Sequence, residues 1–290
     1  MSAFAAGRFK QVLQKMPIYF DLHTEHGTQT SENPADVWHQ WQGENERWLF
    51  LSPHDDDIVC GCGLTFTAAV EMGIDVHAAV IACGRMGYCS LEERNTIKEV
   101  RFKETQESFA QLGLSPDRLY QFDYDDGSLT QEIGRRFAAD AEHSVSRNTA
   151  IAGGTGLENT LTWLFRQVRP TRLFIPNRLD LHLDHKAVHY EAVISVFHAQ
   201  GEIWPELGEP LTQIPMLYEY AIYSDFVKFP THRIRVSNDF VEKRLAALAS
   251  YRSQKQIGLL VEELRKNGGS EYLLEIRFDV FSAAKYESAF

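Results

Sequence analysis

The sequence contains few cysteines, no long apolar run and fewer basic than acidic side chains. Four cysteines in 290 residues are too few for a disulfide scaffold, and the close pair Cys60 and Cys62 lacks the spacing of a zinc ribbon. No segment approaches the roughly 18 apolar residues that a membrane span needs. The first ten residues also lack the apolar core of a signal peptide. We therefore expect a cytoplasmic protein with reduced thiols, in which the cysteines are small core residues.

The charge and the remaining composition narrow the class of protein further. The formal net charge is −11, from 40 acidic and 29 basic residues, which argues against nucleic acid or an anionic membrane as the partner. Hydrophobic residues make up 44% and charged residues 24%, as is usual for a globular protein. We found no internal repeat and no low-complexity tract, so a single domain with a large core is expected.

From Trp48 onward, short apolar runs alternate with segments of helical periodicity. Strand–helix alternation of this kind predicts an α/β fold: one domain with a Rossmann-like, mostly parallel sheet and helices on both faces. The predicted strands cover residues 48–51, 76–83, 118–124, 173–176 and 216–223. The predicted helices cover residues 64–72, 91–112, 158–168, a segment through 193–197, 240–253 and 259–265.

The first 45 residues have no such alternation, and we expect them to be an extension packed on the domain formed by residues 46–290. Two short helices are predicted in the extension, over residues 9–16 and 36–41. Its tryptophans, Trp38 and Trp41, are expected to pack on the main body.

The first informative stretch follows the earliest predicted strand. The apolar run from Trp48 ends at Ser52-Pro53 and is followed by His54 and three aspartates, Asp55-Asp56-Asp57. Three adjacent carboxylates cannot all be buried without a counter-charge, and an imidazole with carboxylates suits a divalent metal. Open α/β sheets also bind their ligands at the carboxyl ends of strands. Taken alone, the stretch fits half of a metal site or a solvated acidic turn equally well.

A second polar stretch, Asp180-Leu-His182-Leu-Asp184-His185, follows the predicted strand over residues 173–176. Both stretches should therefore converge on one edge of the sheet. Together they contain the ligand set of a hydrolytic zinc site, with two histidines, one aspartate and an open position for water. The remaining carboxylates could accept a proton from that water or orient a histidine.

These two stretches resemble the paired signature of the LmbE-like (PIG-L) N-acetylglucosaminyl deacetylase family. The signature is carried by His54-Asp-Asp-Asp57 after Ser52-Pro53 and by His182-Leu-Asp-His185. The resemblance extends from Trp48 to Gln254, and its weaker elements are Gly84-Arg-Met-Gly87, Arg101-Phe-Lys-Glu104, Leu112-Gly113, Asp126-Gly127, Lys243 and Ser253-Gln254.

The resemblance implies a zinc-dependent hydrolase that removes an N-acetyl group from an N-acetylglucosamine-type sugar or glycoconjugate. It implies that His54, Asp57 and His185 bind the metal, with Fe²⁺ or another divalent ion as the alternative to Zn²⁺. By the same resemblance, Asp56 is the general base. His182 stabilises the oxyanion or protonates the leaving amine, and Asp184 orients His182.

Two residues depart from the family pattern. Asp55 lies where the family usually has proline, and Ile58 lies where it often has glutamate. The extra carboxylate leaves the choice between Asp55 and Asp56 as the base less certain. The loss of the glutamate removes a polar contact near the metal but no ligand.

Three further residues are candidate substrate contacts: Arg101, Asp126 and Asp180. Arg101 could bind a sugar hydroxyl or a phosphate, although an arginine near Glu104 on a helix is more often part of a surface ion pair. Asp126 could accept hydrogen bonds from sugar hydroxyls, although Asp-Gly is first of all a turn signal. Asp180, two residues before His182, would lie at the rim of the site.

His189 and three tyrosines have two interpretations each. His189 lies four residues after His185, which also suits zinc on a helix face, but a histidine at this spacing more often orients a ligand or lies on the surface. Tyr218, Tyr220 and Tyr223 could stack on a sugar, but their alternation in a strand is the simpler explanation.

Two other functions stay open. Asp55-x-Asp57 after a strand also resembles the site of an aspartyl-nucleophile phosphatase or phosphotransferase, which uses Mg²⁺ with oxygen ligands and has little use for two histidines. The second is a catalytically inactive carbohydrate-binding member of the fold, supported only by Asp55 and Ile58. The expected partner is a small-molecule amino sugar or glycoconjugate. The sequence identifies neither the exact substrate nor the oligomeric state, and a homo-oligomer is compatible with it.

Overall fold

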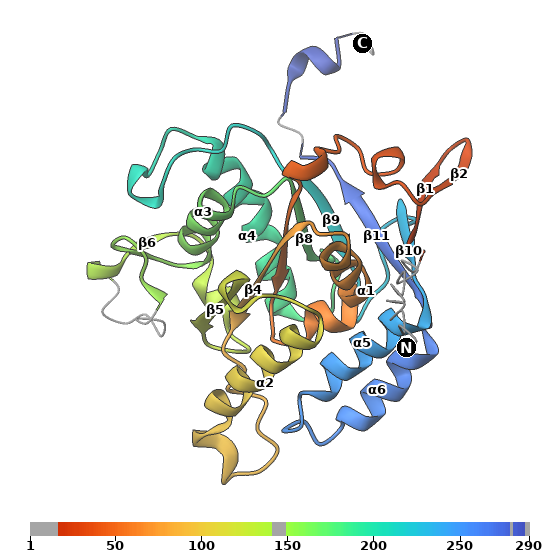
Figure 1. The fold of residues 1–290 in the computed structure, drawn as a ribbon. Coiled ribbons are helices and arrows are strands. Elements are labelled where there is room, and N and C mark those ends of the chain that lie inside the picture. Colours follow the sequence, from red (N-terminus) through yellow and green to blue (C-terminus); the bar gives the residue numbers. More distant parts are fainter. Residues whose placement is uncertain (1–16, 141–148, 279–280, 288–290) are drawn as a thin grey trace, which may run out of the picture.

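A large sheet forms the centre of the protein in the computed structural model, which describes residues 17–140, 149–278 and 281–287 (Figure 1). Its strands are β1 (Tyr19–Thr24), β2 (Gly27–Ser31), β3 (Arg47–Ser52), β4 (Asp75–Ala82), β5 (Leu119–Tyr124), β8 (Arg172–Pro176), β9 (Met216–Tyr220), β10 (His232–Arg235) and β11 (Ser270–Ile276). Their order is β2-β1-β10-β11-β9-β8-β3-β4-β5. A separate small hairpin joins β6 (Arg136–Phe137) and β7 (Gly154–Thr155).

The sheet has a parallel half and an antiparallel half. β9, β8, β3, β4 and β5 pair in parallel, whereas β2, β1, β10 and β11 pair antiparallel, and β11 joins the two halves through β9. The parallel half confirms the α/β fold predicted from the sequence. Strand β3 lies in its middle, and residues 48–52 are completely buried there, as expected for a continuous apolar run in a parallel sheet.

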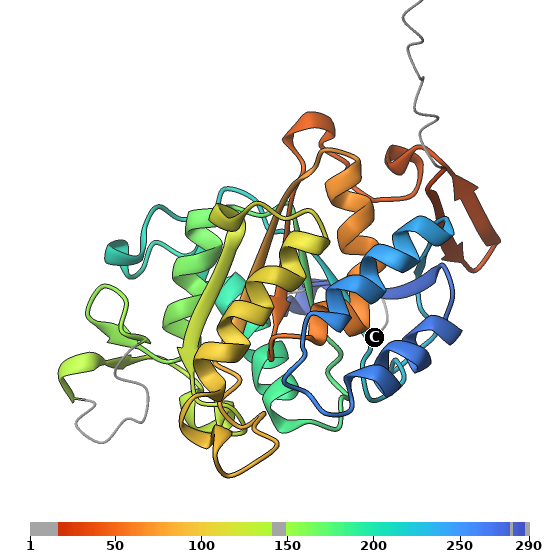
Figure 2. The ribbon, with the colours of Figure 1, turned by 60° about the horizontal axis from the view of Figure 1, so that its bottom comes forward.

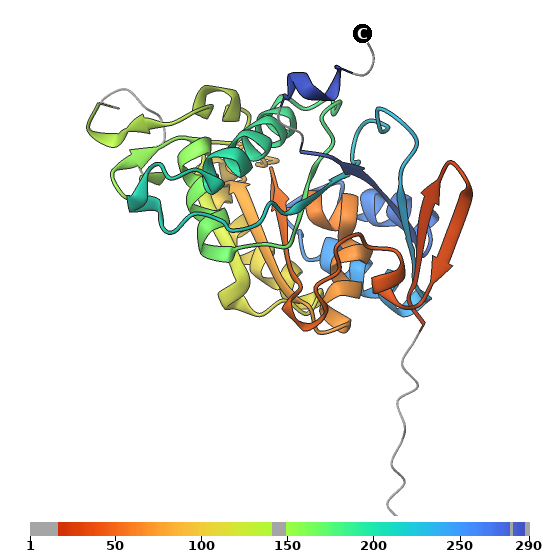
Figure 3. The same ribbon diagram turned by 90° about the horizontal axis from the view of Figure 1, so that it is seen from above.

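Helices cover the two faces of the sheet (Figures 2 and 3). They are α1 (Asp57–Glu71), α2 (Ile97–Gln111), α3 (Leu157–Val168), α4 (Leu183–Gln200), α5 (Asn238–Ala249) and α6 (Ile257–Lys266). Alternate residues of β3 divide between two cores: Trp48 and Phe50 pack with α1 and α5, whereas Leu49 and Leu51 pack with α3 and α4. The alternation places β3 between the two helical layers.

The N-terminal segment differs from its prediction. Residues 36–41 are not a helix, because the chain forms only a 3-10 turn at Pro34–Asp36, and β1 and β2 precede it as an unpredicted hairpin. Trp38 is almost completely buried in the core, with its ring centroid 5.0 Å from that of Trp48. The helix predicted over residues 9–16 lies outside the described residues. The domain boundary at residue 46 stays a prediction, although β1 pairs with β10 within the sheet.

Two other expectations have mixed outcomes. All four cysteines are free, but only Cys62 is a fully buried core residue, and Cys89 is exposed. Helix α2 begins at Ile97 rather than near residue 91, because residues 93–95 form a 3-10 turn. Among the described residues, none of the helices is long and apolar enough to cross a membrane.

Candidate metal centre and active site

The two polar stretches meet because their strands are neighbours. β3 pairs in parallel with β8, with Trp48 opposite Arg172 and Phe50 opposite Phe174, so the residues after both strands emerge side by side. The turn after β3 leads directly into α1. There Gly61 allows close approach to the sheet, since a Cβ atom at this position would lie 2.4 Å from the Tyr220 ring.

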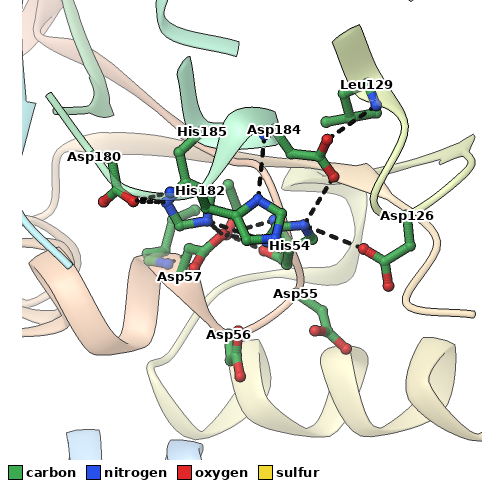
Figure 4. A network of polar contacts seen from close by, with 12 residues as sticks. His54, Asp55, Asp56, Asp57, Asp126, Leu129, Asp180, His182, Asp184 and His185 are labelled. Carbon is green, nitrogen blue, oxygen red and sulfur yellow. Dashed lines mark hydrogen bonds and ion pairs between the residues drawn. The ribbon is translucent and has the colours of Figure 1, made fainter. Parts of the chain in front are cut away.

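Three side chains converge at this edge of the sheet (Figure 4). His54 Nδ1 lies 3.1 Å from His185 Nε2, and both nitrogens lie 3.2 Å from Asp57 Oδ2. In tetrahedral zinc sites, with bonds of about 2.0–2.2 Å, the ligand atoms are roughly 3.3–3.5 Å apart. The triangle of His54, Asp57 and His185, called the metal triangle below, therefore has nearly the size that a small divalent cation requires.

The outer ring nitrogens of the two histidines face carboxylates. His54 Nε2 lies 3.1 Å from Asp126 Oδ1 and 3.2 Å from Asp184 Oδ2. His185 Nδ1 lies 3.2 Å from Asp180 Oδ1. A carboxylate at the outer nitrogen keeps the proton there, so that the inner nitrogen can present its lone pair to a metal. The surroundings thus select the tautomers that metal binding needs.

The same carboxylates raise the pKa values of both histidines. Burial lowers the pKa of His54, but Asp126, Asp184 and Asp57 outweigh it and raise that pKa well above its usual value. Burial also lowers the pKa of His185, and Asp180 and Asp57 raise it to about 9. The cluster therefore attracts positive charge strongly, either as protons or as a metal ion.

Two other groups of possible ligands share His54: one adds His182 and His185, and the other adds Asp126 and Asp184. The second group surrounds the outer nitrogen of His54, where the carboxylates already account for its proton. In the first, His182 Nδ1 accepts a hydrogen bond from the Asp184 backbone N–H at 3.2 Å. The atoms of the metal triangle lie within 3.2 Å of one another, and its members are the residues that the family resemblance implies as ligands, so their binding of a metal stays a prediction.

His182 stands beside the metal triangle, with its ring centroid 4.6 Å from that of His54. Because Nδ1 accepts the hydrogen bond from Asp184 N–H, a neutral His182 carries its proton on Nε2. Burial lowers the pKa of His182, which favours this neutral form. Nε2–H is therefore a hydrogen-bond donor next to the triangle.

The structure corrects the role expected for Asp184. Its carboxylate does not orient His182: it contacts His54 and accepts hydrogen bonds from Gly127 N–H at 2.7 Å and Leu129 N–H at 3.0 Å. The reason is geometric, since Asp184 lies in the first turn of α4 and its side chain points to the loop after β5 (Figure 4). Asp184 contacts the His182 ring through its backbone N–H and not through its carboxylate.

Asp56 is the least buried of the three successive aspartates. Its Oδ2 accepts a hydrogen bond from Gln254 Nε2 at 2.8 Å and lies 3.9 Å from Arg101 Nη2. Asp55 and Asp56 both lie on the side of the turn nearest α2, away from His182 (Figure 4). The assignment of Asp56 as the base stays a prediction, and Gln254 is a partner that the sequence could indicate only through the family resemblance.

Asp55, the departure from the family pattern, forms a buried ion pair. Arg101 Nε donates to Asp55 Oδ2 at 2.6 Å, Nη2 donates to Oδ1, and the guanidinium lies 5.0 Å from the centroid of the Tyr251 ring. The Tyr251 hydroxyl donates to the Asp55 carbonyl. Burial raises the pKa of Asp55 to about 6 in spite of Arg101, so the pair is ionised at neutral pH.

The three residues expected to touch substrate therefore have internal partners. Arg101 is buried against Asp55, and the alternative of a surface pair with Glu104 is wrong, because Glu104 is also buried and accepts hydrogen bonds from Ser253. Asp180 is completely buried behind His185, so it is not at the rim of the site. Asp126 contacts His54 and keeps some exposure.

The structure also separates the remaining candidates. His189 Nδ1 lies 3.0 Å from the Pro176 carbonyl oxygen, and the ring is buried one turn beyond His185. Tyr218 and Tyr220 are completely buried core residues, which leaves no surface for stacking on a sugar. Tyr223 is exposed and stacks on the His185 ring at 5.5 Å between centroids, so it borders the site.

Solved structures similar to this chain include proteins with different activities. One is a conserved protein from Thermus thermophilus, at 25% identity and a TM-score of 0.59, with 81% of this chain and 97% of that chain covered. Another is an N,N'-diacetylchitobiose deacetylase from Pyrococcus horikoshii, at 22% identity and a TM-score of 0.62, with 84% of this chain and 89% of that chain covered. A third is a 4-carboxy-2-hydroxymuconate hydratase from Pseudomonas putida, at 18% identity and a TM-score of 0.59, with 82% of this chain and 98% of that chain covered. The fold alone therefore does not determine the reaction.

Comparison of the sequence itself is more specific. No curated protein matches the chain. The model of the PIG-L family, described as GlcNAc-PI de-N-acetylase, matches residues 49–197, a range that includes every residue of the metal triangle and both polar turns. On this match, and with the fold that accompanies it, the chain belongs to the PIG-L family.

Proposed function

We propose that this protein is a metal-dependent N-deacetylase that hydrolyses the acetamide of an N-acetylglucosamine-type sugar or glycoconjugate. The observation that carries the proposal is the metal triangle, whose three ligand atoms lie 3.1–3.2 Å apart in a member of the PIG-L family. The Pyrococcus horikoshii deacetylase of similar fold supports the same reaction class.

The donor set fits zinc. Two imidazole nitrogens and one carboxylate oxygen are three protein ligands, and a fourth position would be left for water or substrate. A divalent ion bound by His54, Asp57 and His185 would polarise the acetyl carbonyl and lower the pKa of a water molecule. Fe²⁺ or another divalent ion would use the same residues.

Asp56 and His182 would have separate roles in the reaction. Asp56 would accept a proton from the attacking water, with Gln254 fixing one carboxylate oxygen at 2.8 Å. The Nε2–H of His182 would donate a hydrogen bond to the developing oxyanion, and Asp56 would pass the proton that it accepted from the water to the leaving amine. Arg101, which pairs with Asp55, also lies 3.9 Å from Asp56 Oδ2.

The two rival functions have less support. An aspartyl nucleophile needs a free carboxylate, but Asp57 contacts both histidines of the metal triangle and Asp55 is bound by Arg101 through both oxygens. A purely carbohydrate-binding protein would not need carboxylates behind both histidines. Ile58, the second departure from the family pattern, is a buried core residue.

The test is an assay for free amine and acetate with a panel of N-acetylated amino sugars and glycoconjugates. We expect release by the metal-loaded protein, loss after chelation, and recovery when zinc or iron(II) is returned. A loaded protein that releases neither product from any member of the panel would contradict the proposal.

Asp56→Asn tests the base separately from the metal. Because Asp56 is not a member of the metal triangle, the variant should keep stoichiometric metal while turnover falls by about 10²- to 10⁴-fold. Asp125→Asn, which removes the partner of Arg85 on the exposed side of the neighbouring loop, is the matched control and should stay active. Full activity of Asp56→Asn would remove Asp56 from the mechanism and leave the metal assignment intact.

A further inference from the structure

The outer face of α4 carries a row of exposed apolar side chains. Leu183, Tyr190, Ile194 and Phe197 point outward and are 62%, 54%, 44% and 52% exposed. They follow one another at intervals of seven, four and three residues, which places them on one side of the helix. We call these four side chains the α4 face.

The opposite side of the helix is also apolar. Val188, Ala192 and Val196 are buried and pack in the core with α3 and β8. The two acidic residues of α4, Asp184 and Glu191, are buried as well, so no carboxylate of this helix is on its outer side. An apolar row on the outer side of a helix whose inner side is already packed in the core is an exposed patch of the kind that marks an interaction site.

Two other surface helices mix apolar and charged residues on their outer sides. On α2, Val100 and Phe102 are exposed beside Glu99, Lys103 and Glu107, and on α6, Leu259 and Leu260 are exposed beside Glu262 and Lys266. The α4 face differs in that no carboxylate is among its exposed residues, and α4 lies along the outside of the molecule (Figure 3).

We propose that the α4 face binds a second copy of this chain, with α4 packed against its equivalent about a two-fold axis. A two-fold interface brings a patch against itself, so the patch must tolerate its own charge. With a net charge of −11, most of this surface would repel a second copy, whereas the α4 face presents no carboxylate and only Lys186 at its side. The same charge disfavours an anionic membrane as the occupant.

The size of the patch agrees with such an interface. At these exposed fractions each of the four side chains contributes on the order of 100 Å², and Leu181, 74% exposed in the preceding loop, adds a similar amount. Together they supply more than half of the roughly 800 Å² per partner of a standard interface. The flanking residues of an 18-residue helix, about 27 Å long, can supply the rest.

The contact would lie beside the candidate active site. Leu181 and Leu183 flank His182 in the chain, so the second copy would border the same edge of the sheet as the metal triangle. The dimer is inferred from surface chemistry alone and does not depend on the proposed deacetylase activity.

Sedimentation equilibrium of the full chain tests the inference. At about 10 µM, well above the dissociation constant expected for a standard interface, the protein should have twice the chain mass of 33.1 kDa. The double variant Ile194→Glu/Phe197→Glu should weaken the dimer at least 100-fold and sediment as a monomer. Its thermal unfolding temperature should match that of wild-type protein diluted until it is monomeric, because both side chains are already exposed on the surface of one chain.

Leu259→Glu is the matched control, because Leu259 is 71% exposed on α6, and this variant should stay dimeric. A monomeric wild-type protein at this concentration, or a dimer that persists in the double variant, would overturn the proposal. Co-sedimentation of a monomeric wild-type protein with phosphatidylcholine vesicles would assign the α4 face to a membrane surface instead.

Discussion

Asp55 and Asp57 are two residues apart in one turn, and both side chains are buried, but their charges are balanced differently. Asp55 binds Arg101 through both oxygens, and Tyr251 lies against the guanidinium. Asp57 contacts only the two histidines of the metal triangle and the backbone N–H of His54. The first group is neutral by itself. The second contains acceptor atoms that point at one another, and its negative charge is balanced when the histidines take up protons or when a metal ion is bound.

The difference explains how three successive aspartates can occupy one turn. A buried carboxylate needs either a fixed counter-charge or a bound cation, and this turn uses one of each. Asp56, between them, is more exposed and is held by Gln254. We therefore expect changes around Asp57 to alter metal binding, and changes around Asp55 to alter stability.

The largest effect is expected from the metal triangle. His185→Ala should abolish stoichiometric metal binding and reduce turnover by about a thousandfold or more, since several kcal/mol of charge stabilisation are lost. His189→Gln, one helical turn away and outside the triangle, should keep the metal. Elemental analysis of both purified variants makes the measurement, and metal retained by His185→Ala would refute the triangle.

The role of the ion pair between Asp55 and Arg101 is tested by the free energy of unfolding. Arg101→Met leaves Asp55 buried without its counter-charge and should lower the free energy of unfolding by about 3–5 kcal/mol. Arg252→Met, which removes an arginine from the exposed pair with Glu107, should cost no more than about 1 kcal/mol. Urea denaturation measures both. The double variant Asp55→Leu/Arg101→Met should recover much of the loss, and a loss that persists would mean that the pair is not balanced internally.

The pH dependence should differ between metal-free and metal-loaded protein. In the metal-free protein the pKa of His185 is raised to about 9, so its contribution to stability is complete below the unfolded pKa of about 6.5 and disappears as the pH rises through 9. The loss should be no more than about 3.5 kcal/mol. Urea denaturation between about pH 6 and pH 9.5 measures it.

In the metal-loaded protein both histidines are neutral ligands, and this loss at high pH should be absent. Equal pH profiles for the two forms would mean that His185 does not bind the metal. His185→Gln, measured without metal, is the control that should lack the loss.

The smallest effect is expected from Asp180, which lies behind His185 and outside the metal triangle. Asp180→Asn should weaken metal binding by about 10- to 100-fold, because the variant no longer fixes the outer nitrogen of His185 as a proton donor. If Asp180 instead contacted substrate, KM would rise with unchanged metal affinity. Asp225→Asn, an exposed acid in the loop after β9, is the control and should change neither quantity.

The sequence alone was sufficient for the parallel half of the sheet and for the meeting of the two polar stretches at its edge. Continuous apolar runs predict buried parallel strands, and polar residues after two such strands must meet if the strands are neighbours. The antiparallel half was not predicted, since β1, β2, β10 and β11 mix polar with apolar residues. Their strand conformation depends on pairing with partners far away in the chain, as in the pairing of β1 with β10.

The roles of the acidic residues could not be read from the order of residues. Asp184 and Asp180 both lie within two residues of His182, yet their carboxylates face His54 and His185. Arg101, Gln254 and Tyr251 reach the first turn from α2 and from the segment after α5. Contacts between such distant segments are fixed only when the helices pack on the sheet.

What the sequence determined by itself is the chemistry available: two histidines and several carboxylates placed after strands of an α/β fold in the PIG-L family. What only the tertiary structure decided is which carboxylate balances which charge. Asp57 completes the metal triangle, Asp55 binds Arg101, and Asp180 and Asp184 lie behind the histidines. The reason is physical, because a carboxylate's role depends on the charges within a few ångströms of it, and folding brings those charges from distant parts of the chain.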